Sequence, residues 1–264
     1  MSFSTVRDIH ISIVSHGQLG LIVDLLSYLS SQICIDRLQI SLTLNIHERT
    51  VGVIDKYQQY VSVIENKSPK GFAENHNYAF NHCPVPSERL FFFVLNPDIT
   101  IDDTVIADLV KVLENDVSLG VVGPNVISGT GKCEDSARTL PTWFRLVKKL
   151  FGHNNQWVNE LNNNRYYPDW IAGMCMGFHA STFEVIKGFD EKFFLYYEDV
   201  DICSRLWLLG RRVMVVTSVS IVHDARRDSR KKLNYLLWHM TSLLRFLFSD
   251  TYRKVKKFHD SRNS

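Results

Sequence analysis

Two short acidic motifs have the residue types that metal binding and proton transfer require. The first, Asn96-Pro97-Asp98, directly follows the apolar run LFFFVL (90–95), which predicts a strand buried on both faces. Ligands of open α/β sheets collect beyond the carboxyl ends of the strands, so an Asp at this point is well placed to hold Mg²⁺ or Mn²⁺. Because Asn, Pro and Asp all favour turns, a plain turn is the alternative interpretation.

The second motif is EDVD (198–201), at the start of a predicted helix and directly after the aromatic run FFLYY (193–197). Aromatic neighbours remove water from a carboxylate, which raises its pKa and makes it a better proton acceptor. A structural interpretation is also open, because carboxylates stabilise a helix N-terminus and Asp201 is spaced to pair with Arg205. Three apolar residues of the same helix share one face and are expected in the core: Ile202, Leu206 and Leu209.

His223 ends the last predicted strand, and Arg226 and Arg227 follow it closely. A His beside acidic and basic residues at a strand end is a candidate metal or phosphate ligand, and two arginines can neutralise a diphosphate. An exposed basic turn is the ordinary alternative. Gly71 opens a helix predicted over 71–80 and leaves its N-terminus free for a ligand. This run contains neither a P-loop nor a dinucleotide fingerprint.

The elements that would position these residues alternate between strands and helices. Apolar runs predict the strands, and apolar residues at helical spacing predict the helices, one of them capped by Asp102 or Asp103. This alternation predicts an α/β fold with a mostly parallel sheet flanked by helices. The strands are expected at 9–14, 38–44, 61–64, 90–95, 119–122, 170–178 and 213–222, and the helices at 21–29, 71–80, 105–113, 143–151, 198–209 and from 229 onward.

Composition excludes several classes of protein. With 45% hydrophobic and 22% charged residues, the 264-residue chain is typical of a folded globular protein of one large α/β domain. A net charge of +2 predicts no nucleic-acid partner. Five scattered cysteines without a CxxC pair argue against a disulfide framework and favour a reducing compartment. We find no signal-peptide pattern and no apolar run of about 18 residues, so a cytoplasmic protein is expected.

Seven segments, taken together and in this order, resemble the family 2 glycosyltransferases, particularly the rhamnosyltransferase-like branch of bacterial surface-polysaccharide synthesis. They span nearly the whole chain up to about residue 240. Each is weak alone, but seven in sequence are specific. The segments are ISIVSHG (11–17), LTLNIHE (42–48), KGFAENHNYAF (70–80), FVLNPDI (93–99), DWIAGMCMGF (169–178), GFDEKFFLYYEDVDICSRL (188–206) and VHDARRDSRK (222–231).

The resemblance implies a GT-A fold, a nucleotide-sugar donor, Mg²⁺ or Mn²⁺, and an inverting single displacement. It implies that Asp98 and His223 bind the metal and that Asp199 is the catalytic base, with Glu198 as its supporting neighbour. The resemblance also implies a set of donor-binding residues, which lie along the nucleotide, on the helix bordering the donor, at the diphosphate and at the donor–acceptor junction. They are Ser15, His16, Asn45, Gly71, Asn75, Asn77, Asn96, Trp170, Gly173, Arg226 and Arg227.

Two positions depart from the family's pattern. Asn96 stands where many relatives have the first Asp of an Asp-x-Asp element, which implies weaker metal binding. Asn45 stands where many relatives have an Asp that reads the nucleotide, which leaves the nucleotide open. The branch implies dTDP-rhamnose as donor and a lipid-linked O-antigen or capsular glycan as acceptor. One alternative keeps the glycosyltransferase class and changes the donor to a UDP-hexose or UDP-N-acetylhexosamine. A second is a nucleotidyltransferase, which would need a glycine-rich phosphate loop that this sequence lacks. A third is a non-catalytic nucleotide-sugar-binding or membrane scaffold protein.

The C-terminal segment is expected to differ in kind from the rest of the chain. Residues 1–228 are predicted to form the GT-A domain and residues 229–264 a basic amphipathic helical extension. Such a helix can lie on an anionic membrane, which predicts peripheral association with the inner face of the cytoplasmic membrane. Alternatively its apolar stripe packs on the domain and its basic end is solvated. The stripe consists of Leu233, Leu236, Leu237, Met240, Leu244, Leu247 and Phe248.

Overall fold

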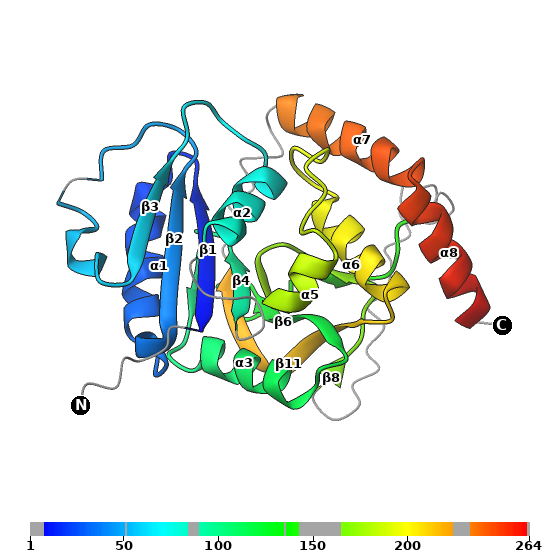
Figure 1. The fold of residues 1–264 in the computed structure, drawn as a ribbon, viewed down its shortest axis with the longest axis horizontal. Coiled ribbons are helices and arrows are strands. Elements are labelled where there is room, and N and C mark those ends of the chain that lie inside the picture. Colours follow the sequence, from blue (N-terminus) through cyan, green and yellow to red (C-terminus); the bar gives the residue numbers. More distant parts are fainter. Residues whose placement is uncertain are drawn as a thin grey trace.

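A nine-stranded sheet runs through the centre of the molecule, with helices on both faces (Figure 1). Its strand order is β3-β2-β1-β4-β10-β6-β11-β5, and β8 pairs with β11 outside this path. The computed structural model describes residues 8–50, 52–83, 90–134, 136–142, 165–223 and 233–262. The α/β fold that the alternating pattern predicts is therefore confirmed.

The N-terminal half of the sheet is parallel and matches the expected strands closely. Its strands are β1 (Ile9–Ser15), β2 (Leu38–Leu44), β3 (Val61–Glu65) and β4 (Phe91–Leu95). Two helices belong to its crossovers, α1 (Leu19–Ser30) and α2 (Phe72–Asn81). Because the strands run in the same direction, the carboxyl ends of β1, β2 and β4 meet at one edge, where α/β proteins bind ligands.

The other half of the sheet is mixed. β10 (Cys175–His179) lies antiparallel between β4 and β6 (Leu119–Ile127). β11 (Arg212–His223) is parallel to β6 and antiparallel to both β5 (Ile99–Ile101) and β8 (Arg165–Tyr166). The single strand expected over 170–178 is wrong, because β9 (Trp170–Ile171) pairs with β7 (Ala137–Arg138) in a separate small sheet. The turn between β9 and β10 moves the chain from one sheet to the other.

The remaining helices differ from expectation at their ends. α3 (Val105–Asn115) begins after Thr104 rather than after Asp102 or Asp103, and Thr104 makes no side-chain capping hydrogen bond. α5 (Ala180–Val185) and two short 3₁₀ turns, Ile35–Arg37 and Asp55–Tyr57, were not expected from the sequence. The helix expected at 143–151 lies outside the described residues.

β4 is buried on both faces, as its apolar run predicts. Phe93 and Leu95 belong to a core shared with α1 and α3, whereas Phe92 and Val94 belong to a second core shared with α6 (Glu198–Leu208). On α6, Ile202 and Leu206 are fully buried as expected, but Leu209 lies beyond the end of the helix and is 46% exposed. All five cysteines are free thiols.

The C-terminal segment forms α7 (Leu233–Leu247) and α8 (Asp250–Arg262), and α8 lies against α6. Phe246, Leu247, Tyr252 and Val255 are buried in the second core, so this segment packs on the rest of the protein. Among the described residues, no helix is long and apolar enough to cross a membrane. Six residues of the predicted apolar stripe remain exposed: Leu233, Leu236, Leu237, Met240, Leu244 and Phe248.

Candidate active site

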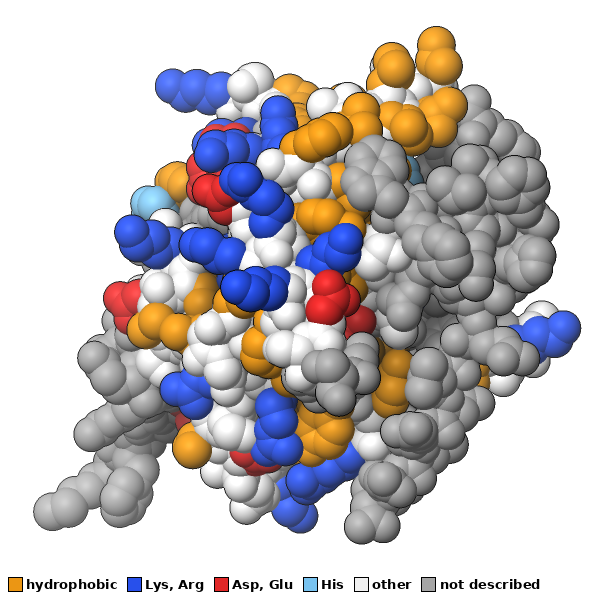
Figure 2. Space-filling model, turned by 90° about the vertical axis from the view of Figure 1, so that its right-hand side faces the viewer, with side chains coloured by type: hydrophobic (Ala, Val, Ile, Leu, Met, Phe, Trp, Pro, Cys, Tyr) orange, Lys and Arg blue, Asp and Glu red, His pale blue; other side chains and the backbone are white. Residues whose placement is uncertain are grey.

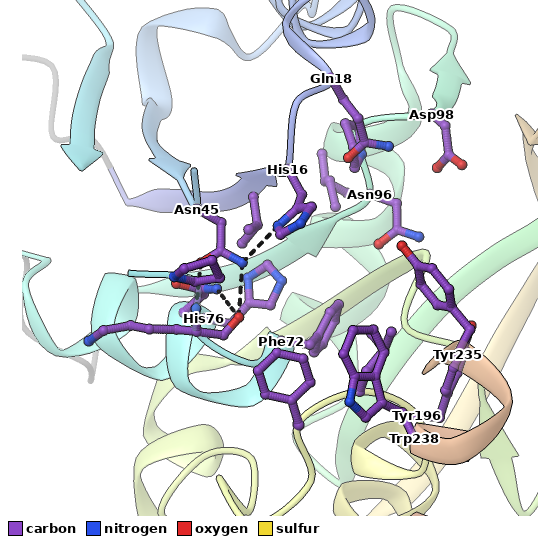
Figure 3. Close-up of a pocket in the computed structure, with 18 of the residues that line it drawn as sticks. His16, Gln18, Asn45, Phe72, His76, Asn96, Asp98, Tyr196, Tyr235 and Trp238 are labelled. Carbon is purple, nitrogen blue, oxygen red and sulfur yellow. Dashed lines mark hydrogen bonds between the residues drawn. The ribbon is translucent and has the colours of Figure 1, made fainter. Parts of the chain in front are cut away.

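A pocket of about 740 Å³ opens where β1, β2 and β4 end (Figure 3). His16 lies just after β1, Asn45 directly follows β2, and Asn96 and Asp98 lie just beyond β4. Asn75, one turn into α2, completes this group. All five were expected along the donor or at the metal, and all five line the pocket. The parallel half of the sheet therefore brings them together from distant parts of the chain.

Asn45 organises the polar wall of this pocket. Its Oδ1 accepts hydrogen bonds from the backbone N–H of Lys70 at 2.8 Å and from the Asn66 amide at 2.9 Å. Its Nδ2 donates to the Lys70 carbonyl at 2.9 Å and lies 3.3 Å from His16 Nδ1. Asn66 also donates to Asn75 Oδ1 at 2.7 Å. An Asp at position 45 would have no N–H for the Lys70 carbonyl, which gives this departure from the family's pattern a structural reason.

Gly71 and Ser15 do not line the pocket, and both have roles in the local backbone structure. The first N–H of α2, that of Phe72, is already used, because it donates to the Phe194 carbonyl at 2.9 Å. A Cβ on Gly71 would lie 2.7 Å from that carbonyl oxygen, so the close approach of the two segments requires glycine. Ser15 is fully buried, and its Oγ accepts a hydrogen bond from the Gln18 N–H at 3.2 Å. That bond holds the turn after β1.

Asp98 and His223, the expected metal ligands, lie side by side. Asp98 Oδ2 is 3.3 Å from His223 Nε2, and Asp98 Oδ1 is buried without a hydrogen-bond partner. The antiparallel register of β5 and β11 pairs Ile99 with His223, which brings the neighbouring Asp98 to the imidazole. In the described part of the chain, no three His, Cys, Asp or Glu side chains gather into a metal site. A cation here would therefore need further ligands from a bound molecule or water.

Glu198 and Asp199 are two adjacent carboxylates whose pKa values are raised. Glu198 is only 4% exposed, and burial, followed by the charge of Asp199, raises its pKa well above the usual range. Burial also raises the pKa of Asp199, against the opposing effects of the Val200 and Gly173 N–H groups and of the Arg138 charge. Those N–H groups donate to Asp199 at 2.8 and 3.2 Å. The raised pKa that the sequence predicts for this motif is found at both residues.

Asp201, in contrast, has the structural role that its spacing predicts. Arg205 Nε donates to Asp201 Oδ2 at 2.7 Å. The same guanidinium donates to the carbonyls of Ile186 and Gly188 at 2.7 and 2.8 Å. Arg205 therefore ties the start of α6 to the turn that precedes it.

A short backbone path connects Asp199 to the strand end that carries Asp98. The Gly173 N–H donates to Asp199, and the carbonyl of the next residue, Met174, accepts a hydrogen bond from the Asn96 N–H at 2.9 Å. Asn96 lies two residues before Asp98. The segment that carries the expected base and the one that carries Asp98 are thus both hydrogen-bonded to Gly173-Met174, although Asp199 itself is not among the pocket-lining residues.

Asn77, expected on the helix that borders the donor, and Trp170, expected at the donor–acceptor junction, do not line the pocket. The side chain of Asn77 donates to the Phe189 carbonyl and accepts from the Phe189 N–H, both at 2.9 Å. Trp170 Nε1 donates to a backbone carbonyl at 3.1 Å. Their polar atoms hold neighbouring loops of the protein itself, so a direct contact with the donor is not supported. Arg226 and Arg227 lie outside the described residues.

Six aromatic side chains line the pocket without having been expected there: Phe72, His76, Phe194, Tyr196, Tyr235 and Trp238. His76 is buried beside Ser12, with Nδ1 2.7 Å from the Ser12 Oγ, and burial lowers its pKa to about 3, so the ring is neutral. Tyr235 and Trp238 are one helical turn apart on α7. Their spacing indicates that they lie on the same face of α7. No pattern in the sequence shows that this face closes the pocket at the ends of β1, β2 and β4.

Comparison with known proteins gives relatives of one kind. The chain is 30% identical over 164 residues to the N-acetylglucosaminyl-diphospho-decaprenol L-rhamnosyltransferase of Mycobacterium tuberculosis, which covers 58% of this chain and 53% of the relative. It is 28% identical over 184 residues to the rhamnosyltransferase WbbL of Escherichia coli K12, covering 67% and 70%. The chain thus spans about half the length of the mycobacterial relative. No protein-family model matches the sequence.

Solved structures agree on the fold. GalNAc-T7 with UDP, GalNAc and Mn²⁺ superposes with a TM-score of 0.59 at 15% identity, over 84% of this chain and 44% of that chain. The mannosyltransferase PcManGT from Pyrobaculum calidifontis, with GDP-Man and Mn²⁺, gives a TM-score of 0.62 at 15% identity, over 91% and 65%. At such low identity these likenesses concern the fold alone.

The architecture is that of a GT-A glycosyltransferase, with the pocket at the strand ends. Within that class the curated relatives are rhamnosyltransferases, so the resemblance to the rhamnosyltransferase-like branch of the family 2 glycosyltransferases is confirmed.

Proposed function

We propose that this chain is an inverting, metal-dependent glycosyltransferase that moves rhamnose from dTDP-rhamnose to a lipid-linked glycan. The observation that carries the proposal is the pairing of Asp98 with His223 beside a pocket whose polar wall comes from three strand ends. The names of both relatives support the sugar, and the name of the mycobacterial relative supports the lipid-linked acceptor.

Asp98 and His223 are the residues that would hold a divalent cation. The buried Asp98 Oδ1 lacks a hydrogen-bond partner, which costs free energy unless something binds it, so the pair fits a cation. One carboxylate with one imidazole suits Mn²⁺ better than Mg²⁺, which prefers oxygen ligands. The bound cation would supply charge stabilisation to the departing diphosphate.

Asp199 is the proposed general base. It takes the proton of an acceptor hydroxyl while the hydroxyl oxygen bonds to the anomeric carbon of the donor. The bond between that carbon and the diphosphate oxygen breaks, and the nucleoside diphosphate leaves on the opposite face, so the configuration inverts. General-base catalysis of this kind contributes roughly 10²- to 10⁴-fold.

The test is donor turnover across a panel of dTDP-, UDP- and GDP-sugars with Mn²⁺ or Mg²⁺ and a lipid-linked acceptor. Transfer from dTDP-rhamnose is expected, with Asp199→Asn at least 100-fold slower and still able to bind dTDP. Asp24→Asn, an exposed carboxylate on α1, is the matched control. If only a UDP-sugar is turned over, the proposed donor dTDP-rhamnose is wrong and a UDP-sugar takes its place. Turnover of no donor would support the scaffold alternative.

The proposal includes contact between α7 and an anionic membrane surface. The exposed apolar row of Leu233, Leu236, Leu237, Met240, Leu244 and Phe248 faces away from the core. Figure 2 shows hydrophobic side chains gathered along the top of this face, with Lys and Arg side chains beside them. The described cations of α7 and α8 are Arg245, Arg253, Lys254, Lys256 and Lys257. Each Lys or Arg near an anionic surface adds about 1 kcal/mol to binding.

Cosedimentation with vesicles tests this contact. The protein is expected to sediment with phosphatidylglycerol-containing vesicles and to remain in solution with phosphatidylcholine alone. Phe248→Glu should weaken the binding about tenfold, whereas Ile33→Glu, at a similarly exposed apolar residue in the turn after α1, should not. Equal partitioning to both kinds of vesicle would exclude an electrostatic membrane contact.

A further inference from the structure

The pocket has two chemically different walls. One wall is built of amides and imidazoles at the ends of β1 and β2 and on α2, with His16 and Asn45 at its centre. The other is aromatic, with Phe194 and Tyr196 from the segment before α6 and Tyr235 and Trp238 from α7. In Figure 3, His16 and Asn45 lie on one side of the pocket, and Tyr196, Tyr235 and Trp238 lie on the other.

The rings of the aromatic wall pack on one another. The Trp238 ring centroid is 5.0 Å from that of Phe194 and 5.2 Å from that of Tyr235. Phe194 is nevertheless 40% exposed, and Tyr235 and Trp238 are only partly buried. The rings therefore hold each other in place while keeping aromatic surface accessible from the pocket, which is the arrangement of a preformed binding surface.

The backbone behind this wall is strained and firmly held. Tyr196 and Tyr197 have φ angles of 68° and 69°, in the left-handed region that bulky residues rarely adopt. Two hydrogen bonds hold this segment from outside: the Phe194 carbonyl accepts from the Phe72 N–H, and the Leu195 carbonyl accepts from the Ser242 hydroxyl, both at 2.9 Å. Such strain persists only where the surroundings enforce it, and it collects at functional sites.

We propose that this aromatic wall, centred on Trp238 with Phe194 and Tyr235, is the platform on which the sugar ring of the acceptor stacks. The inference rests on the proposed function and deepens it by assigning the acceptor subsite to α7. A pyranose ring has an apolar C–H face that packs on aromatic rings and a polar edge that needs hydrogen bonds. The described residues of this wall offer uncharged aromatic ring faces to such a sugar. A diphosphate would instead need cations or N–H groups.

The position of the wall in the chain supports an acceptor over a nucleotide base. The strained tyrosines run directly into Glu198 and Asp199, the residues proposed to remove the acceptor's proton. A nucleotide base would need hydrogen-bond partners at its edges, and the pocket-lining amides of Asn45 and Asn75 lie on the opposite wall. The experiment must therefore distinguish stacking of the acceptor sugar on Trp238 from stacking of a nucleotide base there.

The experiment uses the full chain and soluble acceptors, so that membrane contact does not enter. The probes are the methyl glycosides of N-acetylglucosamine, rhamnose and galactose. For Trp238→Ala we expect the acceptor KM to rise at least tenfold, with kcat for donor hydrolysis and the Kd for dTDP unchanged within twofold. Saturation-transfer NMR should show ring C–H contacts with the wild-type protein that Trp238→Ala loses and Trp238→Phe retains. Tyr167→Ala, an exposed aromatic outside the pocket, is the matched control.

Each other outcome counts against a defined statement. An unchanged acceptor KM in Trp238→Ala, or wild-type protein that hydrolyses donor but binds none of the three glycosides, overturns the platform. Weakened dTDP binding in Trp238→Ala assigns the wall to the nucleotide and also overturns it. Wild-type protein that neither binds nor hydrolyses any donor contradicts the proposed function instead. If Trp238→Ala lowers the thermal unfolding midpoint, Trp238→Leu and Phe194→Leu, which keep apolar bulk without an aromatic face, carry the same test.

Discussion

Asp98 and His223 face each other across the β5–β11 ladder, with Oδ2 and Nε2 3.3 Å apart. Asp98→Asn should slow Mn²⁺-dependent transfer roughly 100-fold or more, because the cation supplies several kcal/mol of charge stabilisation. His223→Ala should raise the Mn²⁺ concentration for half-maximal rate about tenfold. Metal titrations of the transfer rate measure both effects, and His47→Ala, an exposed histidine, is the control. Identical titrations for all variants would exclude this pair as the metal site.

The pH dependence of transfer should report the ionisation of Asp199. The base must be deprotonated to act, and burial raises its pKa, so kcat should fall as the pH drops through that raised value rather than near an ordinary Asp pKa of about 3.9. The Arg138 charge favours the carboxylate, so Arg138→Gln should move this acidic limb to higher pH. Arg49→Gln, an exposed cation after β2, should leave it in place. A shift of the limb to lower pH in Arg138→Gln would contradict the assignment.

Arg205 should be important for stability and not for chemistry. Arg205→Ala leaves the Asp201 carboxylate, which is 3% exposed, without its cation and removes two bonds to carbonyls. Breaking such a pair should lower the free energy of unfolding by about 3 kcal/mol at pH 7, measured by urea denaturation. Burial raises the pKa of Asp201, so this loss should shrink as the pH falls and the carboxyl becomes neutral. A pH-independent loss would show that the carbonyl bonds dominate.

Two glycine substitutions should have opposite effects. Gly71→Ala would place a Cβ 2.7 Å from the Phe194 carbonyl oxygen, so the aromatic segment must shift and stability should fall by about 1 to 3 kcal/mol. Gly20→Ala, in α1 with nothing within 4 Å of the added Cβ, should stabilise by about 0.5 to 1 kcal/mol. Thermal unfolding midpoints compare the two variants. Equal shifts of the two midpoints would contradict the close contact at Gly71.

Local pattern was sufficient for much of the fold. The run LFFFVL predicts a strand buried on both faces, and β4 is buried between two cores because both faces of the sheet carry helices. The same kind of pattern failed over 170–178, where two strands of different sheets read as one apolar run. Apolar residues indicate that a segment is buried but not which strand it pairs with. A change from one sheet to another within an apolar segment therefore leaves no local signal in the sequence.

The candidate site was predicted unevenly for a similar reason. His16, Asn45, Asn75, Asn96 and Asp98 follow or face strand ends and do line the pocket. Asn77 differs from Asn75 by two positions on the same helix, which turns its amide away from the pocket to the Phe189 backbone. Residue type is alike at both positions, and only the packing of the loop that carries Phe189 assigns one to the pocket and the other to the scaffold.

The sequence by itself determined which residue types stand at the strand ends, because strand length and apolar periodicity are encoded locally in hydrophobic and turn-forming side chains. It also predicted the raised pKa of the Glu198-Asp199 pair from the aromatic run beside it. Only the tertiary structure decided that α7 closes the pocket with Tyr235 and Trp238 and that β5 pairs with β11 to bring Asp98 to His223. Those contacts join segments far apart in the chain, and their geometry depends on how whole elements pack, which no single segment specifies.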